Sequence, residues 1–482
     1  MKFRTISAEL MSQAFILLAL TPLFSGQILA QKDPGDICIS CHRTVSPGIV
    51  LQWEKSKHNE AGVNCFDCHQ AAEADPDGFM HNGQRIAIIV SPKDCSQCHI
   101  DEFTQQKGSH HAKAGDILGS LDNVLGEIVG GVPAVNVGCR QCHGSKVKID
   151  SQGHPTADTW PNTGMGRINP DGSRGSCSAC HARHEFSIAQ GRQPEACGKC
   201  HLGPDHPQIE VWTESKHGVL YHANRESMNL ESNPWRAGAE YFTGPTCSSC
   251  HMSAAGQQAV THDVGERISW TLRPIISVKL NMVIFDDDMK EDVLGDAPSL
   301  PKPGDMFKTM NGDTKKVKGV LTWKDRRGHM QGVCSQCHEK AFVKGAYAQF
   351  DEFVALYNDK FASPGNSIMN ELKAAGKITK PDFDDQIEWT WYEIWHHEGR
   401  RGRHGAAMQG PDYAWWQGMY EVSKYFYNDF IPEMKEVAGE EMSKNLLDKY
   451  LYTQPGHLWY RDGMSQEALE QIRKFYRDRY GN

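Results

Sequence analysis

The pentapeptide Cys38-Ile39-Ser40-Cys41-His42 is the first of eight Cys-x-x-Cys-His motifs. The eight use all sixteen cysteines of the chain. In c-type haem attachment, two thiols bind the porphyrin edge and the following histidine ligates the iron. Zinc ribbons and disulfide frameworks do not require a histidine after every second cysteine. The sequence therefore predicts eight c-type haems. The remaining motifs are Cys65, Cys68 and His69; Cys95, Cys98 and His99; Cys139, Cys142 and His143; Cys177, Cys180 and His181; Cys197, Cys200 and His201; Cys247, Cys250 and His251; and Cys334, Cys337 and His338.

Composition agrees with an interior built around cofactors. Only 39% of the 482 residues are hydrophobic, and eight large flat apolar groups would replace side-chain core. The net charge is −9 with histidine neutral, and no basic stripe runs along the chain. We therefore do not expect nucleic acid as a partner.

The first thirty residues resemble a secretory signal peptide. Lys2 and Arg4 precede an apolar run over 14–24, and Ala30 ends a plausible cleavage site. No later segment is apolar enough to predict a membrane span in the mature chain. Since haem is attached to c-type cytochromes outside the cytoplasm, we expect the mature chain, from about Gln31, in a periplasm or an equivalent compartment.

Motif spacing predicts a mostly α multihaem cytochrome c. Seven motifs fall between Cys38 and His251, and such density favours short helices and loops. We expect an octahaem-binding domain over 31–338 and a helical C-terminal domain over 339–482, with helical periodicity at 341–361, 386–401, 412–430 and 465–480. Residues 272–318 carry four prolines and an acidic run, so we expect a solvated, extended excursion with one hairpin.

Fifteen histidines remain once the eight motif histidines are removed from the total of 23. A relay haem carries ligands on both faces, whereas a catalytic haem keeps one face open. His184 lies too close to His181 to share its iron, so it would serve a neighbouring haem. Our candidate second ligands are His58, His110, His154, His184, His217, His262 and His404.

Two segments carry a resemblance to a known family. They are 197–208 (CGKCHLGPDHPQ) and 403–421 (RHGAAMQGPDYAWWQGMYE). With the eight-haem layout, they resemble the octahaem hydroxylamine oxidoreductase family, which includes hydrazine dehydrogenases. The resemblance covers nearly all of the mature chain and implies a mostly α homotrimer. It also implies oxidation of hydroxylamine or hydrazine, with electrons passing to a small redox cytochrome.

The resemblance assigns roles to particular residues. It implies that the catalytic haem is the one on Cys139 and Cys142, with His143 as its ligand. Asp205-His206 matches the family's Asp-His pair over the open face, although His206 could also be an iron ligand. Oxidising members link a tyrosine of a neighbouring subunit to this porphyrin, and here Tyr413 is our first choice and Tyr420 the alternative.

Two other functions fit the same sequence. The scaffold could work reductively, converting nitrite to nitric oxide, hydroxylamine or ammonium, and Arg400, Arg401 and Arg403 could then serve an anionic substrate. Alternatively, all eight irons could be capped, which would make the protein a non-catalytic electron conduit. A tyrosine linkage is made after translation, so the sequence alone leaves the direction of electron flow open.

Overall fold

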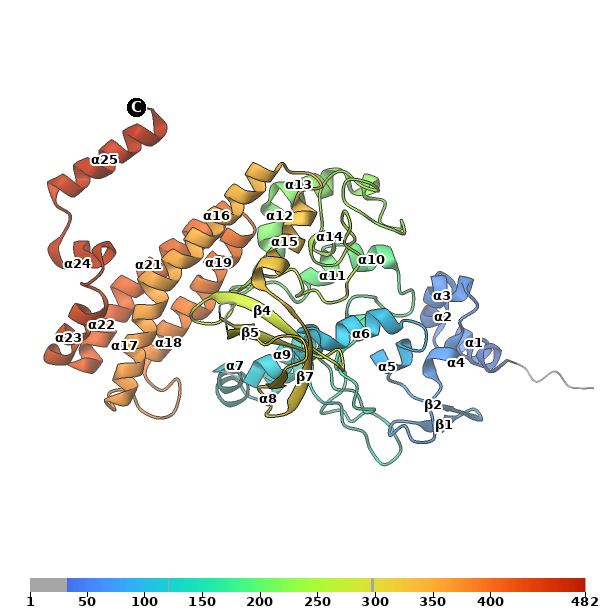
Figure 1. Ribbon diagram of the computed structural model, residues 1–482. Helices are drawn as coiled ribbons and strands as arrows, with labels where there is room; N and C mark the ends of the chain where they lie inside the picture. Colours follow the sequence, from blue (N-terminus) through green and yellow to red (C-terminus); the bar gives the residue numbers. More distant parts are fainter. Residues whose placement is uncertain (1–32, 120, 296–298, 482) are drawn as a thin grey trace, which may run out of the picture.

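The structure, a computed structural model, describes residues 33–119, 121–295 and 299–481. The expected signal peptide, residues 1–30, lies outside the described residues. About 53% of the chain is helical, which agrees with the mostly α prediction. Figure 1 shows α1 to α4 at one end of the molecule and α17, α18, α22 and α23 toward the other.

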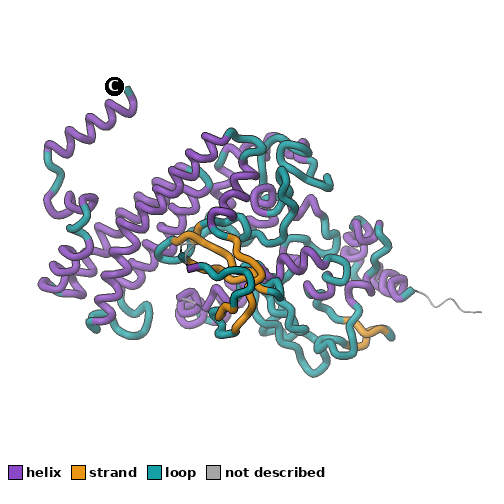
Figure 2. Tube along the Cα trace, viewed as in Figure 1, coloured by secondary structure: helices purple, strands orange, loops and turns teal. Residues whose placement is uncertain are grey.

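The motif-rich half consists of short helices joined by loops (Figure 2). The hairpin of β1 (Phe79–His81) and β2 (Gln84–Ile86) projects from it. Its helices are α1 (Pro34–Val45), α2 (Pro47–Glu54), α3 (Lys57–Glu60), α4 (Cys65–His69), α5 (Pro92–Cys95), α6 (Ile100–Gly108), α7 (Leu121–Asn123), α8 (Val132–Val137), α9 (Cys139–His143), α10 (Ile188–Arg192), α11 (Glu195–Gly198), α12 (Gln208–Glu214), α13 (Lys216–Ala223) and α14 (Cys247–His251).

The segment that we expected to be a solvated excursion is instead a five-stranded antiparallel sheet. Its strands are β3 (Trp270–Thr271), β4 (Val278–Phe285), β5 (Lys290–Leu294), β6 (Met306–Lys308) and β7 (Thr314–Leu321). They run in the order β3-β4-β7-β6, with β5 also paired to β4. Val283, Phe285 and Val317 are at most 2% exposed and form the sheet's core. Burial of these apolar side chains explains why the segment folds.

Helices of 4 to 18 residues fill the C-terminal part. They are α15 (Trp323–Cys334), α16 (Lys340–Tyr357), α17 (Ser363–Ala374), α18 (Gln386–Tyr392), α19 (Gly399–Ala407), α20 (Pro411–Ala414), α21 (Glu421–Tyr425), α22 (Ile431–Ala438), α23 (Glu440–Tyr450), α24 (Leu458–Asp462) and α25 (Gln466–Tyr480). Single π-helical segments join several of them end to end: η7 (Asn358–Ala362), η8 (Glu393–Glu398), η9 (Trp415–Tyr420) and η10 (Phe426–Phe430). Such insertions are frequent at functional sites.

One apolar core holds these helices together. Ile368 and Leu372 from α17 meet Phe426, Phe430 and Met434, and each is fully buried. Removing one such phenylalanine side chain typically costs about 3–5 kcal/mol. α25 projects away from this core (Figure 1), and all of its described side chains are at least partly exposed.

Candidate haem sites and the Asp205–His206 pair

Three of the Cys-x-x-Cys-His motifs fold as single helical turns. They are α4, α9 and α14. In α4 a capping box between Asn64 and Asp67 starts the turn. Residues three apart lie on the same helix face, so the two thiols of a motif point the same way. All sixteen cysteines lie within the described residues, and none of them forms a disulfide there.

Exposure separates three of the predicted haem-binding thiols from the rest. Cys41, Cys98 and Cys337 are exposed, whereas the other thirteen cysteines are partly buried. Each of the three is the second cysteine of its motif.

Backbone carbonyls orient three of the motif histidines. Nδ1 of His69 lies 2.8 Å from the Ala87 oxygen, and Nδ1 of His143 lies 3.0 Å from that of Ala114. His251 makes the same kind of contact at 3.1 Å. A carbonyl only accepts, so Nδ1 carries the proton, and Nε2 keeps the lone pair that a metal needs.

Thiols of different motifs approach one another and connect the sites. Direct contacts or close charges link Cys38 with Cys65, Cys68 with Cys95, Cys95 with Cys177, Cys180 with Cys197, Cys142 with Cys200, Cys197 with Cys247, and Cys250 with Cys334. Numbered along the chain, the motifs form the series 1-2-3-5-6-7-8. Motif 4, which carries His143, joins this series at motif 6.

Several histidine pairs have the spacing of two ligands on one iron. Two such rings have centroids about 6.2 Å apart, for metal–nitrogen bonds of about 2 Å and ring bonds of about 1.33 Å. The structure therefore contains pairs that fit haem iron between them. They are His42–His81 at 6.3 Å, His58–His99 at 6.1 Å, His111–His201 at 6.2 Å and His217–His338 at 6.0 Å.

Two of the histidines that we expected as second ligands contact other side chains and not a motif histidine. His110 contacts the Asp292 carboxylate through Nε2, and His154 packs edge-on against Phe79 at 4.7 Å. His111 and His81 face motif histidines instead. The sequence offered His110 and His111 side by side, and only the turn of the backbone between them decides which ring faces His201.

Burial lowers the pKa of each of the three remaining candidates, His184, His262 and His404. Burial, followed by the charge of His69, lowers the pKa of His184 to about 4. Burial and then the charge of His181 lower the pKa of His262. His404 has its Nδ1 buried without a hydrogen-bond partner, and burial lowers its pKa to about 3. All three are therefore neutral at pH 7, as an iron ligand must be.

Asp205 and His206 form a close acid–imidazole pair in the loop between α11 and α12. Asp205 Oδ1 lies 2.6 Å from His206 Nδ1. Burial raises the pKa of Asp205, but His206, His396 and Arg400 outweigh it and hold that pKa well below its usual range. Burial lowers the pKa of His206, yet the hydrogen bond and charge of Asp205 leave it above the ordinary value. The charge of His206 also lowers the pKa of Cys142 in motif 4, so the pair lies within electrostatic reach of that motif.

Two histidines, His111 and His206, lie at the right distance from His201 to share its iron, and their surroundings differ. The His206 ring also lies 6.3 Å from that of His201. Burial lowers the pKa of His111 to about 3, whereas the pKa of His206 is raised. Burial thus keeps the His111 ring neutral, whereas Nδ1 of His206 is engaged by Asp205, so we assign His111 as the ligand and His206 as the proton acceptor.

The three arginines considered for anion binding have different roles. Arg400 Nη1 lies 3.2 Å from Asp205 Oδ2. Arg401 donates to the Pro204 carbonyl at 2.9 Å. Arg403 is fully buried and donates to the Pro274 carbonyl and to Ser277 Oγ, which connects α19 to the loop between β3 and β4. Among the three, Arg400 is therefore the one beside the Asp205–His206 pair.

Sequence reasoning did not assign His396 to the site. This residue lies in η8, with Nδ1 3.8 Å from Asp205 Oδ2 and Nε2 2.8 Å from Asp122 Oδ1. Tyr392, one helical turn earlier, donates to the same Asp122 oxygen at 2.9 Å. The i, i+4 spacing of Tyr392 and His396 was the available signal, but it does not reveal contacts with Asp122 or Asp205.

The two candidate tyrosines differ in exposure. Tyr413 is 8% exposed, whereas Tyr420 is 41% exposed. Tyr420 clusters with Trp415 (51% exposed) and Trp416 (57% exposed), both in η9. A contiguous apolar surface of this kind is typical of a contact with another chain.

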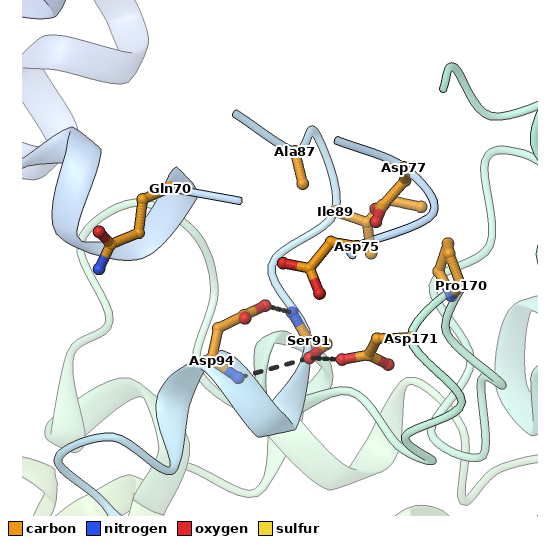
Figure 3. Close-up of a pocket in the computed structure, with 9 residues that line it drawn as sticks. All are labelled: Gln70, Asp75, Asp77, Ala87, Ile89, Ser91, Asp94, Pro170 and Asp171. Carbon is orange, nitrogen blue, oxygen red and sulfur yellow. Dashed lines mark hydrogen bonds between the residues drawn. The ribbon is translucent and has the colours of Figure 1, made fainter. Parts of the chain in front are cut away.

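A pocket elsewhere collects acidic side chains (Figure 3). Asp75, Asp77, Asp94 and Asp171 line it, together with Ser91. The Asp94 carboxylate caps the Ser91 amide at 2.7 Å, and Ser91 Oγ donates to Asp171 at 2.7 Å. Asp77 is 5% exposed, and burial raises its pKa to about 6.

Comparisons with known proteins agree with the haem motifs. Residues 169–293 match the family described as seven times multi-haem cytochrome CxxCH, and residues 89–202 match cytochrome c3. A probable nitrite reductase–hydroxylamine oxidoreductase fusion protein of Kuenenia stuttgartiensis is 26% identical over 68% of this chain. The chain spans only 36% of that relative's length. Cytochrome c-554 of Nitrosomonas europaea is 26% identical over 36% of this chain and 69% of its own.

Solved structures show the same fold. A protein titled hypothetical multiheme protein has a TM-score of 0.66 and 26% identity, over 87% of this chain and 96% of its own. The Kuenenia stuttgartiensis reducing HAO-like complex Kustc0457/Kustc0458 has a TM-score of 0.57 and 20% identity, over 87% of each chain. Among the described residues, no helix is long and apolar enough to cross a membrane. Residues 89–293 thus match multihaem cytochrome c families, and the chain is similar to a protein named for hydroxylamine oxidoreductase.

Proposed function

We propose that this protein oxidises hydroxylamine or hydrazine at the haem on Cys139 and Cys142. The observation that carries the proposal is the Asp205–His206 pair beside Cys142. Oxidising either substrate releases protons as well as electrons. His206 accepts a proton through Nε2, because Nδ1 is engaged by Asp205. Asp205 orients the ring and stabilises its charged form.

Seven further haems then carry electrons away to a small redox cytochrome. The motif thiols and histidines hold them, and the second ligands we propose are His58, His81, His111, His184, His217, His262 and His404. The catalytic haem supplies an iron with one open face for the substrate. The connected series of motifs supports a continuous route between the sites.

A homotrimer in a periplasmic compartment is part of this proposal. A tyrosine that reaches a neighbouring subunit must be exposed on its own, so exposure favours Tyr420 over our first choice, Tyr413. The aromatic cluster around Tyr420 supplies an apolar contact surface.

Reduction of nitrite is the second candidate. Arg400 is 13% exposed and places a permanent positive charge against Asp205. Such a charge suits an anionic substrate better than neutral hydroxylamine. The Kuenenia relative is named for both activities.

An optical spectrum of the dithionite-reduced protein tests the proposal. A tyrosine-linked haem should give a red-shifted band beside the ordinary c-type peaks. The Tyr420→Phe variant should lose this band and Tyr413→Phe should keep it. Absence of the band in the unaltered protein, with one iron still binding carbon monoxide, would favour nitrite reduction. Absence of both would leave an electron conduit.

A further inference from the structure

A chain of alternating carboxylates and imidazoles continues from Asp205 away from the haem motif. Asp205 uses Oδ1 for His206 and turns Oδ2 toward His396 Nδ1, 3.8 Å away. On its far side, His396 Nε2 lies 2.8 Å from Asp122 Oδ1. Three segments far apart in the sequence thus supply one line of proton-binding groups.

The surroundings of His396 hold its ring in this line. The residue is 4% exposed, and its ring stacks on Tyr392 with centroids 4.2 Å apart and planes 20° apart. Tyr392 also donates to Asp122 Oδ1, so the same oxygen receives the tyrosine hydroxyl and the imidazole. The ring therefore has a fixed orientation, with one nitrogen toward each carboxylate.

His396 Nδ1 is buried and has no hydrogen-bond partner. An unsatisfied buried polar atom is rare in folded proteins and calls for a reason. At 3.8 Å from Asp205 Oδ2, it is too far for a hydrogen bond and close enough to form one after a small rotation. Proton transfer between the two groups provides that reason.

Exposure to solvent increases toward the Asp122 end of this chain of carboxylates and imidazoles. The side chains of His396 and Asp205 are 6% and 18% exposed, while that of Asp122 is 24% exposed. Asp122 therefore has the greatest access to water among the three. The Arg400 guanidinium lies beside Asp205 and helps to keep that carboxylate ionised between transfers.

We propose that His396 is a proton-relay residue that connects the Asp205–His206 pair with Asp122 and water; this rests on the proposed function. A proton taken up at His206 Nε2 displaces the Nδ1 proton to Asp205. Asp205 turns and passes one proton to His396 Nδ1, while the Nε2 proton of His396 moves to Asp122 and on to water. One proton enters, one leaves and no electron moves. The transfer leaves both histidines in the opposite tautomers, and exchange of their ring protons with water resets them for the next transfer.

Cyanide binding to the oxidised holoprotein tests this relay without turnover. Hydrogen cyanide must lose a proton to bind ferric iron as the anion, so a base and an outlet for the proton speed its binding. His396→Gln keeps an amide near Asp122 but cannot relay protons. We expect its cyanide association rate to fall by about 10- to 100-fold, toward the range that positioned proton-transfer groups contribute. The dissociation constant should change less than about twofold, since the relay affects only the rate.

His397→Gln is the matched control. His397 follows His396 in η8, but its Nδ1 bonds Glu393 at 2.6 Å, so its variant should bind cyanide at the unaltered rate. If His396→Gln fails to fold, Asp122→Asn replaces it and should slow binding likewise. Equal rates in His396→Gln and the unaltered protein would overturn the relay alone. No cyanide binding by the unaltered protein would overturn the open haem, and with it both proposals.

Discussion

Replacing His111 by alanine tests the assignment of iron ligands most directly. His111 and His201 have ring centroids 6.2 Å apart, the spacing expected across one iron. Burial holds the pKa of His111 at about 3, so its ring is neutral and able to ligate. In the variant, the haem on Cys197 and Cys200 should lose one ligand and become open.

The expected magnitude is a count of open irons. With one open catalytic haem, the reduced protein should bind about one carbon monoxide per chain, and His111→Ala should bind about two. Titration of the reduced protein, followed in the Soret region, gives this number. His110→Ala is the matched control, because the neighbouring ring contacts Asp292, and its variant should still bind about one.

Two results would refute the reasoning. If His111→Ala still binds one carbon monoxide and His206→Ala binds two, His206 is the ligand of that haem and not the base. If His110→Ala binds two carbon monoxide molecules per chain, His110 and not His111 is the iron ligand opposite His201.

Three further changes have defined outcomes. Asp77→Asn should stabilise the protein at pH 7.5 by about 1–3 kcal/mol and raise its melting temperature. Burial raises the folded-state pKa of Asp77 from 3.8 to about 6, so the stability of the unaltered protein falls as pH rises through that window. The stability gained in Asp77→Asn should therefore vanish at pH 4, and a lower melting temperature of the variant at pH 7.5 would contradict the prediction. Arg326→Leu should cost about 3–5 kcal/mol in denaturant unfolding, because fully buried Arg326 bonds Asp292 at 3.0 Å; an unchanged midpoint would show that the pair is dispensable. Asp205→Asn should lower kcat for hydroxylamine and shift the acidic limb of the pH–rate profile to lower pH, since His206 loses the partner that raises its pKa. An unshifted limb would show that His206 does not accept the proton in the rate-determining step.

Local patterns predicted much of this protein. The motif pattern predicted a multihaem cytochrome c, which the family comparisons support, and helical periodicity located segments that coincide with α16, α18 and α25. The sheet was missed because its strands pair across long loops, as Val283 does with Val320. No local pattern marks that pairing, whereas burial against the partner strand creates it.

Long-range contacts also limited the prediction of the site. Asp205-His206 is adjacent in sequence and could be recognised as a pair. His396 approaches Asp205 from 191 residues away, and that approach depends on how η8 packs against the loop before α12. His111 was missed for a smaller reason, because adjacent residues in a turn face opposite sides and the sequence does not reveal which side faces His201.

The order in which the motif thiols meet has a consequence for timing. Motif 4 contacts motif 6, while the other motifs continue the series on both sides. With a haem at every motif, the catalytic haem would be a side branch of a longer chain of haems. That chain would hold several electrons at once. Several electrons from one substrate could be stored along it before any acceptor docks. The rate of the chemistry and the frequency of collisions with the acceptor could then vary independently.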